Sequence, residues 1–267
     1  MKTYGEERSF LESCGVRVVE LSDESGRARV CLVPAWQGRV MTSTAAGTGG
    51  PGYGWINRSL IASGVRKSRF NPFGGEERLW LGPEGGPFSL YFAPGAEQVY
   101  ANWLVPAVID TERYDIAEQS AARVRFTKSA KLFNASGVSF DMGIERTISL
   151  LDAEAVAGVL GAELPAGLKV VAYETDNRIT NRGENAWTKQ TGLPSIWLLG
   201  MFNPTATTTV FIPYAEDAEG PVVNDTYFGK VPADRLVAGD GMLRFRIDGK
   251  YRAKIGIPAP RAKGICG

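Results

Sequence analysis

The chain has 267 residues, of which 30 are basic and 29 acidic, so that its formal net charge is +1. The basic residues are scattered rather than clustered, which excludes the electrostatic footprint of a nucleic-acid-binding or anionic-membrane-binding protein. The sequence contains no histidine, which excludes a Ser-His-Asp triad, a histidine general base and any metal site that needs histidine. Any chemistry must therefore use carboxylates, lysine, tyrosine, arginine or amides.

Cysteine content and the N-terminus limit the compartment and the cofactors. Cys14, Cys31 and Cys266 are odd in number and widely spaced, so they form neither a disulfide framework nor a zinc-binding pattern. We expect no metal and no cofactor. Residues 1–14 carry charges and lack the apolar core of a secretory signal. We expect a cytoplasmic location, or a periplasmic one if a signal has been removed, and no membrane span.

In chain order, residues 5–14 predict a short helix that ends at Gly15. Residues 16–21 and 28–33 read as two strands joined by the turn at 23–26. A second helix is predicted at 152–164, where Asp152 is a suitable N-cap. Further strands are predicted at residues 39–43, 88–92, 113–117, 122–127, 138–151, 169–180, 195–202, 207–213, 242–247 and 253–257.

These elements predict the fold class. Strands dominate, turns between them are short, and no repeating strand–helix–strand rhythm is present, which argues against parallel α/β folds. The sequence therefore predicts an all-β protein, a large antiparallel β-sandwich with one or two short helices. No segment has the composition of a linker, so we expect a single domain over residues 1–267.

The densest group of polar and aromatic residues lies at 71–88, where glycines and prolines interrupt the chain at short intervals. We interpret this stretch as a rigid, irregular platform that could bind a sugar. Arginine donates several hydrogen bonds, carboxylates accept from paired hydroxyls, and tryptophan stacks on the apolar face of a sugar ring. Alternatively, the same residues brace the loop and fill the core. The candidate binding residues are Asn71, Arg78 and Trp80, and the candidate catalytic carboxylates are Glu76, Glu77 and Glu84.

A second group of candidate binding residues lies farther along the chain. In a strand, Asn177 and Asn181 share a face, so that their amides could line a polar pocket, with Trp187 in the following turn. The more common role of such amides is to cap turns.

Four segments carry a resemblance to a known family: residues 34–44, 54–57, 71–86 and 195–202. They resemble a family of largely uncharacterised bacterial proteins related to the aldose 1-epimerases, of galactose mutarotase-like β-supersandwich fold. The resemblance implies that Arg78 helps to hold a sugar and places Arg39 in a shared motif. Aldose 1-epimerases use a histidine acid and a glutamate base, and this chain has no histidine. Proteins of the similar family extend farther, so we also expect a fragment with an exposed sheet edge near its C-terminus.

The function predicted on these grounds is carbohydrate binding, with a sugar or oligosaccharide as the partner. The protein could be a carbohydrate-active enzyme in which carboxylates serve as acid and base. The alternatives are a noncatalytic structural or interaction domain and an aldose 1-epimerase that lacks the usual histidine.

Overall fold

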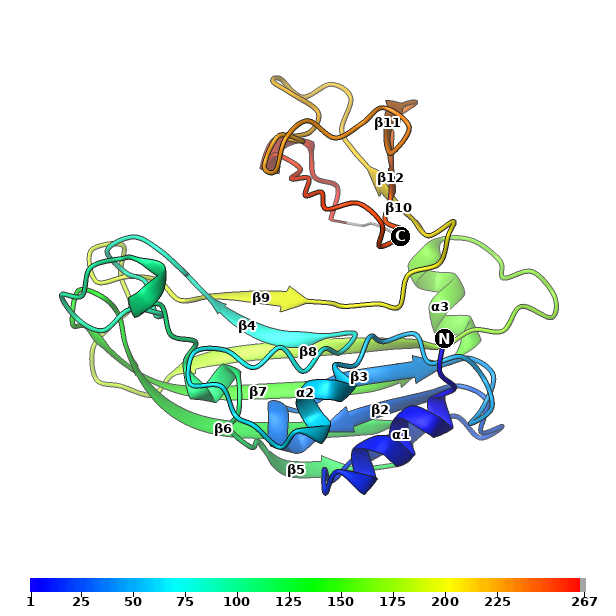
Figure 1. Ribbon diagram of the computed structural model, residues 1–267, viewed down its shortest axis with the longest axis horizontal. Coiled ribbons are helices and arrows are strands. Elements are labelled where there is room, and N and C mark those ends of the chain that lie inside the picture. Colours follow the sequence, from blue (N-terminus) through cyan, green and yellow to red (C-terminus); the bar gives the residue numbers. More distant parts are fainter. Residues whose placement is uncertain (265–267) are drawn as a thin grey trace. The chain divides into compact units, whose positions relative to one another are not determined.

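The computed structural model describes residues 1–264 and shows an all-β protein with antiparallel strands and a few short helices, as predicted (Figure 1). By their internal contacts the described residues form two compact units, Met1–Asn203 and the chain from Pro204 onward. Cys266 lies outside the described residues. No helix of residues 1–264 is long and apolar enough to cross a membrane.

The first unit contains three sheets. β1 (Val19–Ser22), β2 (Arg29–Val33) and β3 (Arg39–Thr44) form one antiparallel sheet. β4 (Arg78–Gly82) pairs with β9 (Ser195–Leu199). A bridge between Val40 and Glu77 joins these two sheets along one layer. The other layer runs in the order β5 (Asp115–Gln119), β6 (Arg123–Phe133), β7 (Ser139–Leu151) and β8 (Ala172–Asn181).

The two layers enclose the main hydrophobic core. Strict alternation along β7 turns Phe140, Met142, Ile144 and Ile148 inward, as expected for a half-buried strand. They meet Leu32, Val40, Leu79 and Leu81 of the opposite layer. Arg146 occupies the same inward-facing row of β7. The sandwich therefore buries a charged side chain in an otherwise apolar row.

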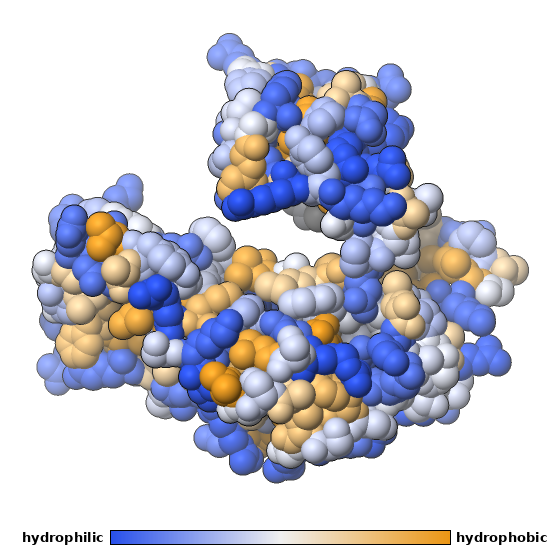
Figure 2. Space-filling model, viewed as in Figure 1, coloured by the Kyte–Doolittle hydropathy of each residue, from blue (hydrophilic) through white to orange (hydrophobic). Residues whose placement is uncertain are grey.

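A second core forms where two helices cover the other face of the β1–β2–β3 sheet (Figure 1). The helices are α1 (Tyr4–Ser13) and α2 (Arg58–Ala62). Trp36 stacks on Phe73 with ring centroids 4.1 Å apart, and Cys31 is buried beside them. Figure 2 shows that hydrophilic side chains cover much of the viewed face of this unit, with hydrophobic ones in smaller groups between them.

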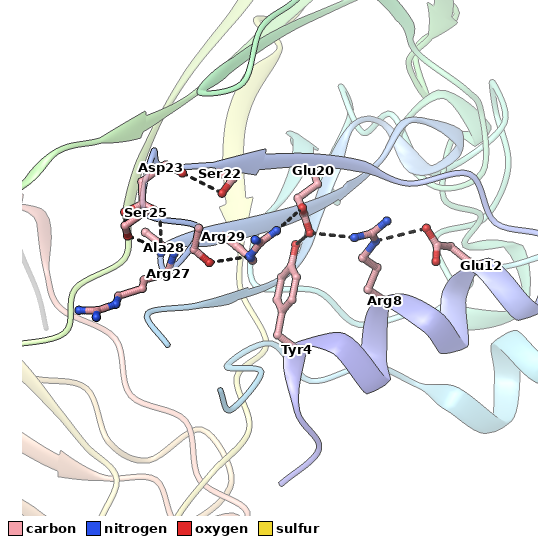
Figure 3. Close-up of polar contacts among 11 residues, drawn as sticks. Tyr4, Arg8, Glu12, Glu20, Ser22, Asp23, Ser25, Arg27, Ala28 and Arg29 are labelled. Atoms are coloured by element: carbon pink, nitrogen blue, oxygen red, sulfur yellow. Dashed lines mark hydrogen bonds and ion pairs between the residues drawn. The ribbon is translucent and has the colours of Figure 1, made fainter. Parts of the chain in front are cut away.

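Charged contacts attach α1 to the sheet (Figure 3). Thr3 and Glu6 form a capping box at the start of the helix, which satisfies backbone donors that have no partner within the helix. The Glu20 carboxylate on β1 accepts from the Tyr4 hydroxyl at 2.9 Å and from Arg8 Nη1 at 3.3 Å. It also accepts from Arg29 on β2 at 2.5 Å. One carboxylate therefore links a helix and two strands.

The second unit is built on a three-stranded antiparallel sheet in the order β10 (Thr209–Pro213), β12 (Met242–Arg246) and β11 (Leu236–Gly239). Asp248 is buried against this sheet and accepts from both terminal nitrogens of Arg235, at 3.0 and 3.3 Å. Arg261 is also buried and donates to backbone carbonyls of residues 215, 216 and 220.

Several predicted elements are correct, and others are not. The predicted helices correspond to α1 and to α3 (Ala153–Leu160), whose first turn is capped by Asp152. Residues 88–92 and 253–257 are not strands, although their apolar residues suggested it. The platform predicted at 71–88 contains strand β4, all five residues of which are buried. Apart from Gly82, which ends the strand, its glycines and prolines flank β4 instead of making the whole segment irregular.

Candidate functional site

Glu76 is a buried carboxyl between the two layers, at the entry to β4. One of its oxygens, Oε1, accepts from the backbone N–H of Ser43 at 2.5 Å and from the Ser43 hydroxyl at 3.1 Å. The other, Oε2, accepts from the Tyr173 hydroxyl of β8 at 3.4 Å. Burial raises the pKa of Glu76, against the lowering effect of these hydrogen bonds. Glu76 therefore exchanges its proton closer to neutral pH than an ordinary carboxyl does.

Glu77, the next residue, points to a different partner. Its Oε1 accepts from Nη2 of the wholly buried Arg146 at 2.6 Å, so the ion pair crosses from one layer to the other. Adjacent side chains on extended backbone point to opposite sides, which accounts for this division of partners. Arg146 was not among the predicted residues.

The inward face of β8 is polar along part of its length. Strand pairing sets Asn177 opposite Arg146 and Tyr173 opposite Leu150 on β7. Asn177 Nδ2 donates to the Thr175 hydroxyl at 3.1 Å, while Asn177 Oδ1 is buried and has no hydrogen-bond partner. Tyr173, Thr175 and Asn177 are each half-buried. Because β8 pairs only with β7, these side chains lie at the rim of the sandwich rather than in its middle.

Burial keeps the Tyr173 phenol protonated. It raises the pKa of Tyr173 well above the usual value, and the nearby Glu76 and Glu77 carboxylates raise it further. A protonated phenol next to a proton-binding carboxyl can donate and accept hydrogen bonds in turn. Glu76, Glu77, Arg146, Tyr173 and Asn177 therefore form one polar group, which we call the rim site.

Arg78 is neither in an open cleft nor paired with Glu76 or Glu77. It is buried, contacts Asp110 at 3.5 Å and donates to the carbonyl of Ile109. Asp110 Oδ2 in turn accepts from the backbone and side chain of Asn71, at 3.0 and 2.8 Å. The pKa of Arg78 is lowered to about 10 because of burial. The structure thus places Asn71 and Arg78 in an interior network.

Arg39 belongs to the same interior network and is also fully buried. It donates to the carbonyl of Gly74 at 3.1 Å and to Gln37 Oε1 at 3.2 Å, and its guanidinium lies 5.7 Å from the centre of the Phe73 ring. Burial and the neighbouring Arg78 lower its pKa.

Trp80 and Glu84 interact directly. The indole Nε1 of Trp80 donates to Glu84 Oε1 at 2.5 Å, and the ring packs 5.5 Å from Tyr91 and 4.5 Å from the Arg78 guanidinium. Trp80 is buried, so its ring is part of the core, which is the structural alternative given for it above.

The remaining predicted residues do not join the rim site. Asn181 accepts from the backbone N–H of Gly183 and donates to the carbonyl of Asn185, which is a turn-capping role. Trp187 packs edge-on against Phe140, with centroids 5.8 Å apart.

Two exposed aromatic rings flank the backbone around Glu76. Trp55 is 37% exposed and its ring lies next to Gly74. The backbone N–H of Trp55 donates to the carbonyl of Met201. Phe202 is 56% exposed and lies against Gly200, which itself contacts the backbone of Glu76. Both rings were outside the predicted set of binding residues. The motif at 54–57 indicated Trp55 only as part of the family resemblance.

Tyr173 and Arg146 were missed because their partners are far away in the sequence. Tyr173 lies 97 residues from Glu76, and Arg146 lies 69 residues from Glu77. One local signal was available for Arg146: the alternation of residues 145–150 puts it on the same strand face as Ile148 and Leu150. An arginine on the apolar face of a strand requires a buried acidic partner.

The rim site offers hydrogen-bonding groups and no evident metal site. Within residues 1–264 no group of three or more cysteine, aspartate or glutamate side chains could hold a metal ion. Carboxyl, phenol and amide groups beside exposed aromatic rings suit a neutral polar ligand with an apolar face.

The fold and these groups define an antiparallel β-sandwich protein with a buried charged network and a polar rim. The chain belongs to a family of unknown function, DUF6786, whose model matches residues 2–267. No curated protein is significantly similar to it. Among solved structures, it is similar to the Slr1438 protein from Synechocystis sp. PCC 6803, with 14% identity and a TM-score of 0.45. That likeness covers 86% of this chain and 84% of the other.

Proposed function

We propose that this protein binds a carbohydrate at the rim site. The observation that carries the proposal is the polar inward face of β8, where Tyr173, Thr175 and Asn177 lie half-buried beside the buried Glu76. A sugar presents closely spaced hydroxyls, each of which both donates and accepts. Phenol, hydroxyl and amide groups at one edge match that pattern.

The exposed aromatic rings support the same ligand class. Trp55 and Phe202 flank the Glu76 segment, and a sugar ring has apolar C–H faces that pack on aromatic surfaces. Binding sites of this kind combine apolar surface with a few fixed polar groups. The interior residues Arg39, Asn71, Arg78 and Trp80 would shape the site from below and would not contact the ligand, since they are buried.

Calorimetric titration with a panel of neutral monosaccharides and oligosaccharides at up to millimolar concentration tests the proposal. We expect Asn177→Ala and Trp55→Ala to weaken binding of the sugar that binds best, by roughly fivefold or more each. The matched control is Arg178→Ala, which changes the exposed neighbour of Asn177 on the outward face of β8 and should leave affinity unchanged. If the folded protein binds none of the sugars, the proposal is wrong.

The contact between Tyr173 and Glu76 favours a second candidate function, anomer interconversion. In that reaction a base removes the proton of the anomeric hydroxyl while an acid protonates the ring oxygen, so the bond between the anomeric carbon and the ring oxygen opens. Glu76, with its raised pKa, would be the base and the protonated Tyr173 the acid, in place of histidine.

Polarimetry separates the two functions. An epimerase would accelerate the approach of a fresh sugar solution to its anomeric equilibrium, and Tyr173→Phe would reduce that rate at least 10-fold while leaving sugar affinity within about fivefold. A protein that binds sugar without accelerating mutarotation has the binding function alone.

A further inference from the structure

The interior network and the rim site together bury three arginines. Arg39, Arg78 and Arg146 are each no more than 2% exposed, and within residues 1–264 they pair with two carboxylates, Asp110 with Arg78 and Glu77 with Arg146. Glu76 is the remaining buried acid of this region, and it is held by Ser43 and Tyr173. Among the described residues, Arg39 therefore has no carboxylate partner.

Arg39 does not lose its charge, because the arginine guanidinium stays protonated in proteins. A buried charge that lacks a partner is costly, and its neighbours normally include a counter-ion or a set of hydrogen-bond acceptors. Arg39 has no counter-ion among its three acceptors, which are two backbone carbonyls and the side-chain oxygen of Gln37.

The same network also has donors with nothing to donate to. Nε and Nη1 of both Arg78 and Arg146 are buried without a hydrogen-bond partner, as is Nε of Arg39. Nε2 of Gln37 and the hydroxyl of Tyr114 are in the same state. Native proteins leave few buried polar atoms unpaired. Here they include atoms of Arg39 and Arg78, which both contact Asp110, and of Arg146, whose partner Glu77 precedes Arg78 in the chain.

We propose that this network is a binding site for a small monovalent anion of the halide type, enclosed by Arg39, Arg78 and Arg146 between the two layers of the sandwich. An anion there would give Arg39 the counter-ion that it lacks and would accept from the unpaired Nε and Nη1 donors of Arg78 and Arg146. The full burial of the three arginines excludes a ligand the size of a sugar from this position. The site shares Arg146 with the rim site, but Arg39 and Arg78 lie in the interior network, and the proposal does not depend on the proposed function.

The first test is the melting temperature at constant ionic strength, with chloride replaced stepwise by the bulky anion gluconate. Because a ligand that binds only the folded state stabilises it, the melting temperature should rise by about 3 °C for each tenfold increase in chloride above its Kd. Arg39→Met should abolish this dependence. The matched control Arg178→Met removes an exposed arginine of the same unit and should retain it. A melting temperature that does not respond to chloride in the unmodified protein contradicts the proposal.

The second test does not rely on a variant that folds. Crystals of the unmodified protein grown in bromide should show an anomalous peak within hydrogen-bonding distance of at least two of the three arginines. Ordered water alone at that position, with no anomalous signal, would overturn the proposal.

Discussion

Arg146 of β7 and Glu77 at the entry to β4 are joined by a 2.6 Å ion pair that crosses the sandwich, with no part of the arginine exposed. Both layers would lose a fixed contact if either partner were removed, and the other would be left as a buried, unpaired charge. The cost of such a charge exceeds the net gain from forming the pair. Removal of one partner should therefore cost more stability than the intact pair contributes.

Glu77→Leu and Arg146→Met should each lower the free energy of unfolding by about 3–5 kcal/mol, because each leaves one buried charge without its partner. Urea denaturation monitored by tryptophan fluorescence measures this. The double variant Glu77→Leu/Arg146→Met should recover most of the loss, since two apolar side chains replace the pair. If the loss of unfolding free energy in the double variant equals the sum of the losses in the two single variants, the two residues act independently.

The glycines of the segment at 74–86 have different roles, which substitution separates. Gly74 has φ of +91°, and a Cβ there would lie 2.1 Å from the Trp55 carbonyl oxygen. Gly86 has φ of +80°, but a Cβ would meet nothing within 4 Å. We expect Gly86→Ala to cost about 1 kcal/mol from backbone strain alone and Gly74→Ala to cost at least about 3 kcal/mol. Equal costs in chemical denaturation would mean that the Trp55 backbone moves aside freely.

Local pattern was enough to predict the fold class, because alternation along β7 and the capping residues Thr3 and Asp152 act within a few positions. Local pattern did not predict the burial of Arg78 and Trp80 on β4, since these residues are buried by contacts with segments beyond residue 90. The same limit applies to the rim site. The motif indicated Glu76 as one of three candidate carboxylates, whereas Tyr173 is brought to it only by the pairing of β8 at the sheet edge.

The raised pKa of Glu76 makes stability depend on pH in a defined direction. A carboxyl whose pKa is higher in the folded state holds its proton more tightly there, so its contribution to stability is complete below the ordinary value of 4.5 and declines as pH rises through the folded-state pKa. Glu76→Gln removes this titration. We expect its free energy of unfolding, relative to that of the unmodified protein, to increase as pH rises above 4.5. A difference that stays constant across this range would show that Glu76 ionises normally.

Asp248 in the second unit should show the opposite dependence. Its hydrogen bonds from Arg235, followed by that from the backbone of Lys250, lower its pKa from 3.8 to about 2. A carboxyl with a lowered pKa contributes stability that is complete above its ordinary value and is lost as pH falls through the folded-state pKa.

We therefore expect hydrogen exchange of the β10–β12 backbone amides to accelerate, relative to that of Asp248→Asn, as pH falls from 3.8 to 2. Arg246→Gln, which removes a single contact at 3.3 Å and leaves both Arg235 contacts in place, serves as the control and should keep most of this acid sensitivity. Since Asp248 also accepts from the backbone N–H of Lys250 at 3.0 Å, the asparagine variant preserves an acceptor and isolates the effect of charge. Equal acid sensitivity in the unmodified protein and Asp248→Asn would mean that the Arg235 contact does not persist in solution.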